Sequence, residues 1–212
     1  MTNKLFCCWF GGLNKMSFNR KSCLESIFHH NKNVILITEE NLNEWIKKPH
    51  PSFSFLSETH KSDYVRTYLA RFYGGGYTDI KRHHFNWDKY FEELNNEENT
   101  WMIGSTEANP WDTAVLDLQP HYKSLLSMCS YIIRPNTSLT IEWYDGMIKK
   151  LDEKYTHLTL NPSKHPQDKA ESGSGYPLRW AEILGEFFHP ACFKYKDHLK
   201  HSMPKLDFSN YR

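Results

Sequence analysis

The chain has 212 residues, of which 39% are hydrophobic and 24% are charged, and its formal net charge is +1. This composition is typical of a soluble globular domain, and the near-neutral charge provides no broad electrostatic footprint for nucleic acid. No apolar run approaches the length that spans a bilayer, and the run from Leu5 to Phe10 is too short for a secretory signal. We therefore expect a single domain over residues 1–212, with no nucleic-acid partner and no membrane span; the sequence leaves open whether it belongs to a longer protein.

The cysteine pattern indicates a reducing compartment. The five cysteines are odd in number and include no C-x-x-C pair, so neither a disulfide framework nor a zinc site is expected. We predict a cytoplasmic protein with free thiols at Cys7, Cys8, Cys23, Cys129 and Cys192.

The N-terminal part of the chain predicts a β-α-β unit. The continuous apolar run from Lys4 to Phe10 is typical of a strand buried on both faces. Residues from Arg20 to His30 have helical periodicity, and those from Val34 to Thr38 form a β-branched strand. This order favours a right-handed crossover and a parallel pair of strands. A short helix over Asn41 to Lys48 and a strand candidate over Ser52 to Leu56 follow.

The most informative stretch runs from His60 to Lys81. Ser62 is a favoured N-cap residue, which predicts that a helix begins there with Asp63 in its first turn. Three glycines then end the helix, and residues 77–80 predict a short buried strand that carries Asp79 near its end. Open α/β sheets bind ligands at the carboxyl ends of their strands, so we expect Asp63 and Asp79 to share one pocket. The apolar face of the helix is formed by residues at helical spacing: Val65, Tyr68, Leu69 and Phe72.

The remaining elements are predicted from periodicity and turn residues, and no internal repeat interrupts them. Helices are expected over Trp87–Leu94, Leu139–Tyr155 and Pro177–Phe188, and strands over Trp101–Ser105, Tyr131–Ile133 and Ala191–Tyr195. The segment from Thr156 to Tyr176 is rich in Pro, Ser, Gly, His and Lys, which predicts a long mobile loop.

The motif Ser62-Asp63-x-x-Arg66, followed by one helix and then Gly-Gly-x-Tyr77-x-Asp79, resembles the sugar-binding region of GT-A nucleotide-sugar glycosyltransferases. The similar enzymes are those of the capsular-polysaccharide and initiating mannosyltransferase type, the clostridial glucosylating toxins, and virus-encoded glycan-building enzymes. The resemblance is clear from Lys4 to Lys81. It implies an α/β fold of GT-A type, in which helices cover both faces of a central, mostly parallel, twisted sheet. It also implies a nucleotide-sugar-binding half, residues 1–81, and an acceptor-side half, residues 82–212.

The resemblance assigns roles to five residues that bind the donor. Asp63 would accept hydrogen bonds from hydroxyls of the donor sugar, and Arg66 would approach the sugar or the diphosphate. Tyr77 would touch the nucleotide, Trp9 would stack on uracil, and Thr38 would contact the ribose or base. Core packing for Trp9 and helix capping for Thr38 are the alternatives, and a surface ion pair would also explain Asp63 and Arg66.

The resemblance departs at Lys81, where such enzymes have a second carboxylate. Their two carboxylates bind Mn²⁺ or Mg²⁺, which neutralises the donor diphosphate. Here Asp79 either holds a divalent cation together with donor phosphates, waters and a later residue, or Lys81 supplies a fixed positive charge instead; a third alternative is that Asp79 only caps a turn. Our expectation is a weakly held metal at Asp79, with His83 or His84 as a possible extra ligand.

The chemistry implied by the resemblance is transfer of a sugar from a UDP-sugar, such as UDP-glucose or a related hexose or deoxyhexose, to a glycan or glycoprotein acceptor. The residues that would carry it are Asp63, Arg66 and Asp79, because the leaving diphosphate needs its charge neutralised. Retention of anomeric configuration is expected, with a donor phosphate oxygen taking the acceptor proton. No residue stands out as a catalytic base.

The acceptor side is less well defined by the sequence. The polar loop from Ser105 to Asp112 would face the acceptor, which makes Glu107, Asn109 and Asp112 candidates, with Asp117 as a further possible base. From the long loop and the segment after it, basic residues are candidates to reach the donor phosphates: Lys164, His165 and Arg179.

Three rival interpretations stay open. The donor could be a GDP-sugar such as GDP-mannose. The protein could be a degenerate transferase that binds a nucleotide or glycan without turnover, which Lys81 favours. It could also be an unrelated doubly wound nucleotide-binding protein, although Gly11-Gly12 alone falls short of a phosphate-loop fingerprint.

Overall fold

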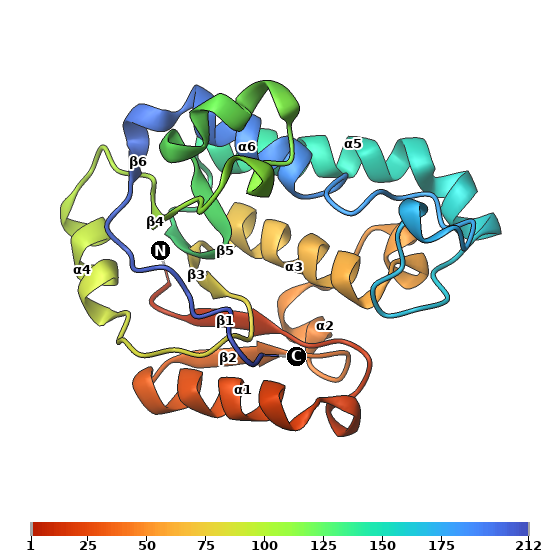
Figure 1. The fold of residues 1–212 in the computed structure, drawn as a ribbon, viewed down its shortest axis with the longest axis horizontal. Coiled ribbons are helices and arrows are strands. Elements are labelled where there is room, and N and C mark those ends of the chain that lie inside the picture. Colours follow the sequence, from red (N-terminus) through yellow and green to blue (C-terminus); the bar gives the residue numbers. More distant parts are fainter. Residues whose placement is uncertain (1, 212) are drawn as a thin grey trace.

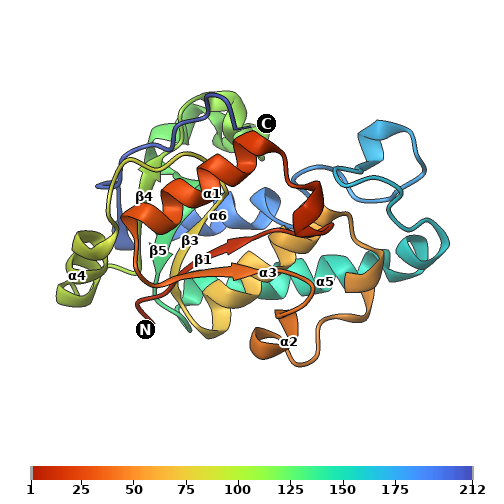
Figure 2. The same cartoon turned by 90° about the horizontal axis from the view of Figure 1, so that it is seen from below.

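A six-stranded sheet runs through the centre of the molecule in the computed structural model, which describes residues 2–211 (Figure 1). The strand order is β2-β1-β3-β5-β4-β6. Neighbouring strands are parallel except at β5, which runs antiparallel to both β3 and β4, so the sheet is mixed and mostly parallel. The expected α/β class, with helices on both faces of a mostly parallel sheet, is confirmed (Figure 2).

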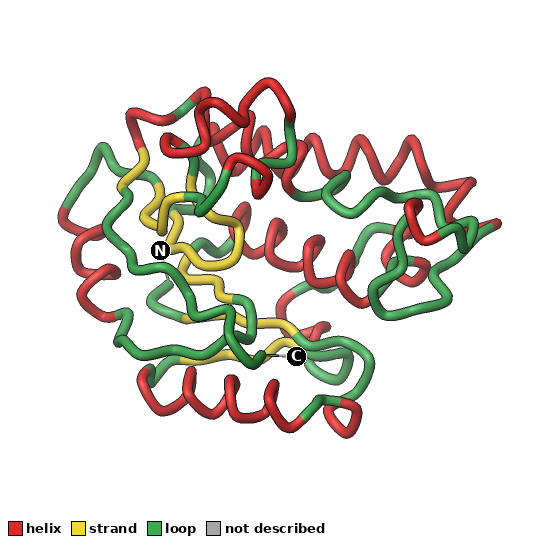
Figure 3. The backbone as a smooth tube through the Cα atoms, viewed as in Figure 1, coloured by secondary structure: helices red, strands yellow, loops and turns green. Residues whose placement is uncertain are grey.

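The elements have the following bounds. The strands are β1 (Leu5–Cys8), β2 (Val34–Ile37), β3 (Gly75–Thr78), β4 (Met102–Thr106), β5 (Leu126–Ile133) and β6 (Leu199–Lys200). The helices are α1 (Phe18–His30), α2 (Leu42–Trp45), α3 (Glu58–Phe72), α4 (Asp88–Asn96), α5 (Ser138–Leu160) and α6 (Gly185–Lys194). After β6 the chain continues as a loop to its described end (Figure 3). The loop contacts the sheet side through a backbone hydrogen bond from Met203 to Gly104 in β4 and through an isolated bridge between Arg82 and Asp207.

Strand β1 separates two hydrophobic cores, which explains its uninterrupted apolar sequence. Phe6 and Cys8 belong to the core that packs against α3, α5 and α6. Leu5 and Cys7 point to the opposite face and join the core that includes α1 and α4. Alternate side chains of a strand face opposite sides, so a strand with helices on both sides must be apolar at every position.

The predicted β-α-β unit is confirmed. Strand β1 pairs in parallel with β2, and α1 connects them; its N-cap residue Ser17 accepts a hydrogen bond from the backbone N–H of Arg20. The same β1 pairs in parallel with β3 on its other edge. The carboxyl ends of these strands therefore meet on one side of the sheet, where Asp79 follows β3.

The predicted start of the helix that carries Asp63 was wrong. Helix α3 begins at Glu58, because Ser57 is its N-cap and accepts a hydrogen bond from the backbone N–H of His60. The Ser62 hydroxyl instead donates to the carbonyl oxygen of Glu58, inside the helix. Asp63 consequently lies in the second turn, beyond the reach of the first-turn dipole effect.

Two strand predictions were wrong because short apolar runs do not distinguish a strand from a helix. Residues Pro51–Phe55 form a 3₁₀ helix, which proline favours at its first position. The predicted strand Ala191–Tyr195 lies within or just after α6, and Ala191 and Cys192 are buried in the core with one face of that helix. The predicted helix from Pro177 begins only at Gly185, and α5 extends to Leu160, into the predicted loop.

The turn between α3 and β3 depends on two glycines with left-handed backbone angles. Gly74 has a φ of 63° and Gly75 a φ of 95°. A Cβ atom on Gly75 would lie 2.9 Å from the backbone oxygen of Lys4, because β3 passes close to β1 there. Glycine at this position therefore allows the chain to leave α3 and enter the sheet directly.

We expect Gly75→Ala to destabilise the protein by about 2 kcal/mol or more, because alanine meets both backbone strain and a steric clash. Gly173→Ala is the matched control, since Gly173 also has a positive φ of 72° but has nothing within 4 Å of the added Cβ. The control should lose about 1 kcal/mol. Urea unfolding measures both, and equal losses would contradict the assigned role of the clash.

Candidate functional site

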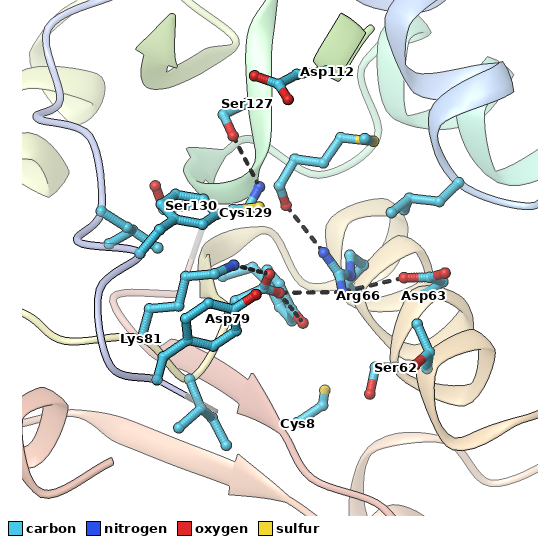
Figure 4. Close-up of a pocket in the computed structure, with 18 of the residues that line it drawn as sticks. Cys8, Ser62, Asp63, Arg66, Asp79, Lys81, Asp112, Ser127, Cys129 and Ser130 are labelled. Atoms are coloured by element: carbon cyan, nitrogen blue, oxygen red, sulfur yellow. Dashed lines mark hydrogen bonds and ion pairs between the residues drawn. The ribbon is translucent and has the colours of Figure 1, made fainter. Parts of the chain in front are cut away.

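A cavity of about 930 Å³ lies at the carboxyl ends of β1 and β3 (Figure 4). Its walls come from segments far apart in the sequence. They are the end of β1, parts of α1 and α3, the residues after β3 and β4, the first half of β5, the segment before α6, and the C-terminal loop. In Figure 4, Asp112 lies on the opposite side of the cavity from Cys8.

Four ionisable side chains, in which acids and bases alternate, line the cavity together, and we call Asp63, Arg66, Asp79 and Lys81 the charged row. The Arg66 Nη2 atom lies 3.1 Å from Asp63 Oδ1 and 3.2 Å from Asp79 Oδ1. The Lys81 Nζ atom lies 2.7 Å from Asp79 Oδ2 (Figure 4). The structure thus brings the two expected carboxylates together on one guanidinium group, as the shared-pocket prediction requires.

The charged row is placed by α3 and by the end of β3. Asp63 and Arg66 are one turn apart on α3, so they lie on the same side of the helix. The Arg66 guanidinium carbon lies 4.4 Å from the centre of the Tyr77 ring, and its Nη1 donates to the carbonyl oxygen of Met128. The Tyr77 hydroxyl donates to Asp79 Oδ1 at 3.2 Å. Tyr77 therefore supports the arginine and orients the carboxylate.

The environment keeps three members of the row charged. Burial opposes the charge of Asp79, but Lys81 and Arg66 outweigh burial and hold the pKa of this carboxyl well below its ordinary value. Burial likewise opposes the charge of Lys81, and the neighbouring Asp79 raises the pKa of that amine nonetheless. Asp63 differs, because burial raises its pKa to about 7 and Arg66 only partly offsets the effect. Asp63 can therefore hold or release a proton near neutral pH.

The two residues predicted to contact the base and ribose of the nucleotide, Trp9 and Thr38, are placed differently. Trp9 lines the cavity, and its Nε1–H donates to the carbonyl oxygen of Gly12 at 2.9 Å. Thr38 is not among the lining residues; it is buried at the end of β2, where its backbone N–H donates to the side chain of Asn41. The Trp9 side chain is accessible from the cavity, so a base bound there can contact it. Thr38 is not accessible from the cavity, so a contact with the ribose would require this segment to move.

Another part of the cavity wall carries a buried pair that the sequence did not reveal. Glu107 lines the cavity, and its Oε1 lies 3.1 Å from His189 Nε2. The Nδ1 atom of His189 accepts a hydrogen bond from the backbone N–H of Ala114, so the ring proton sits on Nε2 and is donated to Glu107. His189 is fully buried and orients Glu107 toward the cavity.

The other predicted acceptor-side residues have mixed placements. Asn109 and Asp112 line the cavity and cap the short helix Pro110–Asp112 together, since Asp112 accepts from both the backbone and the side chain of Asn109. Asp117 does not line the cavity.

The basic residues predicted to reach the donor phosphates lie outside the cavity lining. Lys164 donates to the carbonyl oxygen of Ser174 and does not line the cavity, and neither does His165. Arg179 is engaged by Glu182 and Glu186 outside the cavity.

The C-terminal loop forms a further wall that no pattern in the sequence predicted. Lys205, Phe208 and Tyr211 all line the cavity. The Lys81 Nζ atom lies 4.3 Å from the centre of the Phe208 ring and 5.5 Å from that of Tyr211. Only the chain's tertiary path brings these aromatic rings to Lys81.

The residues at Asp79 do not fit a divalent cation of the kind expected from the resemblance. Both Asp79 oxygens already face positive side chains, and the part of the chain that the structure describes holds no group of three or more His, Cys, Asp or Glu side chains able to bind a metal. His83 is buried beside Thr78 and the Lys81 carbonyl, and His84 lies beside Asp207. A divalent ion about 4 Å from the Lys81 ammonium would be repelled by on the order of 8 kcal/mol at an effective dielectric constant of 20.

The fold and the cavity define an α/β protein with a cleft lined by charged side chains at the carboxyl edge of its sheet. A family model described as "Capsular polysaccharide synthesis protein" matches residues 1–132, so the chain belongs to that family, whose name indicates a role in building glycans. The match crosses the predicted boundary at residue 81. A search of curated proteins found no match. Within residues 2–211, no helix is both long and apolar enough to cross a membrane.

The raised pKa of Asp63 predicts a pH-dependent stability. Its ordinary pKa is 3.8 and its folded value about 7, so between these pH values the folded state keeps a proton that the unfolded state has released. The contribution of Asp63 to stability is therefore present below about pH 4 and is lost as pH rises toward 7. The Asp63→Asn variant has no carboxyl group at this position, so its stability does not fall with pH for this reason. The stability of the variant relative to the wild type should rise by about 1–4 kcal/mol between pH 4.5 and 7.5.

Urea unfolding at a series of pH values measures this difference. Asp145→Asn, on the exposed side of α5, controls for the removal of one carboxylate. A stability difference between Asp63→Asn and the wild type that stays constant across the range would show that Asp63 is ionised throughout.

Proposed function

We propose that this protein is a glycosyltransferase of GT-A type, which moves a sugar from a UDP-sugar to a hydroxyl of a glycan or glycoprotein acceptor. The observation that carries the proposal is the convergence of Asp63 and Asp79 on Arg66 in the wall of a large cavity. Membership in a capsular polysaccharide synthesis family supports the same class of chemistry. The cavity volume of about 930 Å³ lies within the range common for small-molecule and cofactor sites.

The donor would occupy the side of the cavity formed by α1, α3 and the end of β3. Trp9 offers an aromatic face for the uracil base, and Asp63 offers carboxylate oxygens to hydroxyls of a glucose-like sugar. The diphosphate would lie against Arg66 and Lys81, whose charges stabilise the negative charge that develops on the leaving group. UDP-glucose or a related hexose or deoxyhexose is the proposed donor.

The acceptor would enter on the side of Glu107, Asn109 and Asp112. Glu107, held by His189, can accept a hydrogen bond from the acceptor hydroxyl and aim its oxygen. That oxygen bonds to the anomeric carbon while the bond from this carbon to the diphosphate oxygen breaks, and the electron pair leaves with the diphosphate. In the retaining mechanism that we propose, a phosphate oxygen of the leaving group takes the acceptor proton on the same face.

A second candidate function is binding without turnover. The 2.7 Å ion pair between Lys81 and Asp79 favours it, because the position of a metal-binding carboxylate is taken by an ammonium group. In this alternative the cavity would hold a nucleotide or glycan and release it unchanged.

Incubation with UDP-glucose, UDP-galactose and GDP-mannose distinguishes these functions. We expect release and transfer of sugar from a UDP donor. Asp79→Asn should lower both rates about 100-fold, because Asp79 holds Lys81 and Arg66 in place for the leaving group. Glu98→Gln, an exposed carboxylate on the surface, is the matched control. Turnover of GDP-mannose alone would contradict the UDP-sugar proposal, and NMR of an inverted anomeric proton would contradict retention.

The acceptor role of Glu107 has its own test. Glu107→Gln keeps an oxygen that accepts from His189 but removes the negative charge, so the KM for an oligosaccharide acceptor should rise about tenfold while hydrolysis of the donor stays unchanged. Asp117→Asn, outside the cavity, is the matched control. Equal losses of hydrolysis and transfer in Glu107→Gln would place this carboxylate on the donor side instead.

A further inference from the structure

We propose that the donor site neutralises a nucleotide diphosphate with Lys81 and Arg66 rather than with a divalent cation. This inference rests on the proposed function, because it concerns how the same site holds its donor. It starts from the geometry at Asp79, where one carboxylate oxygen faces Lys81 Nζ at 2.7 Å and the other faces Arg66 Nη2 at 3.2 Å.

The charge of the site is the same as that of a metal-loaded pair of carboxylates. Two carboxylates and one divalent cation sum to zero, and so do one carboxylate and one ammonium group. At the position of the second carboxylate, Lys81 contributes the single net positive charge that a carboxylate with a bound divalent ion would contribute. The Lys81 substitution therefore preserves the electrostatics that a leaving diphosphate requires.

The cation at Lys81 is built into the wall of the cavity. Lys81 is 4% exposed, and the rings of Phe208 and Tyr211 lie beside its ammonium group. Aromatic faces attract a cation, and the Asp79 carboxylate fixes its position. Arg66 is 7% exposed and is held by Asp63, Asp79 and the carbonyl oxygen of Met128. Neither side chain needs to be ordered when the donor arrives.

A divalent ion would have to displace this arrangement. Mn²⁺ and Mg²⁺ need several oxygen ligands, and Asp79 can offer oxygens only if Lys81 and Arg66 withdraw. Withdrawal would leave the buried Lys81 without its carboxylate partner and the buried Arg66 without one of its two, which is costly. The diphosphate, in contrast, can bind both cations without breaking either ion pair, because Lys has three N–H donors and Arg has five.

Calorimetry with UDP and GDP as probes tests the proposal, in EDTA and in Mn²⁺ or Mg²⁺. The Kd of the wild-type protein for the preferred nucleotide should agree within about twofold between the two conditions. Lys81→Ala should weaken binding about tenfold or more in EDTA, because a charge-assisted contact to phosphate is lost. Lys81→Arg should keep most of the affinity, and Lys48→Ala, an exposed lysine, should keep all of it.

Lys81→Asp provides the sharpest comparison, because it creates a pair of carboxylates at positions 79 and 81. This variant should bind the nucleotide poorly in EDTA and recover in Mn²⁺, whereas the wild type should show no such dependence. Direct titration of Mn²⁺, followed by its electron paramagnetic resonance signal, should detect binding to Lys81→Asp only. Circular dichroism and thermal unfolding establish that each variant is folded.

Two results would overturn the inference. If the wild type binds UDP or GDP only when Mn²⁺ or Mg²⁺ is present, the site is metal-dependent, and the proposed glycosyltransferase function stands without it. If the folded wild type binds neither nucleotide in any condition, the proposed function itself fails and the inference falls with it.

Discussion

The contact on which the site depends is the bridge that Arg66 makes between Asp63 and Asp79. A buried guanidinium group needs partners, and removing one partner of a buried ion pair typically costs about 3–5 kcal/mol. Here the partners belong to different elements: Asp63 lies on α3, and Asp79 follows β3. The arginine therefore ties the helix to the edge of the sheet and, by the same contacts, turns positive charge toward the cavity.

The path of the backbone makes this bridge possible. Gly74 and Gly75 let the chain reverse from α3 directly into β3, which runs beside β1. The end of β3 is then opposite the second turn of α3, at the edge of the sheet where the carboxyl ends of parallel strands meet. Burial on both faces of the sheet holds these elements rigidly, so the charged row keeps its spacing.

The charges of the row are consistent with the proposed transfer. Lys81 and Arg66 stay positive beside Asp79, so the proposed diphosphate would meet two cations that are already in place. Elsewhere in the cavity lining, Glu107 is an oriented carboxylate, because the His189 ring donates a hydrogen bond to one of its oxygens. A cavity lined by two cations and by an oriented carboxylate is compatible with the proposed transfer between a charged donor and a hydroxyl.

The local sequence was sufficient to predict the strands β1, β2 and β3 and the helices α1 and α3, but not the 3₁₀ helix Pro51–Phe55. Apolar runs and helical spacing predicted β1, α1, β2 and the α3–β3 unit, because these signals act between residues a few positions apart. The motif around Asp63 and Asp79 also predicted that the two carboxylates would share a pocket. The exact start of α3 was missed, since Ser57 and Ser62 are equally good caps in isolation and only the packed helix chooses between them.

Tertiary structure alone decided the rest of the site. Glu107 meets His189, and Lys81 meets Phe208, across long stretches of chain that carry no common spacing. The apolar run around Ala191 became part of α6 because that helix packs one face on the core. Periodicity reports which face of an element is apolar, whereas the partner across a cavity is set by the path of the whole chain, which no local pattern encodes.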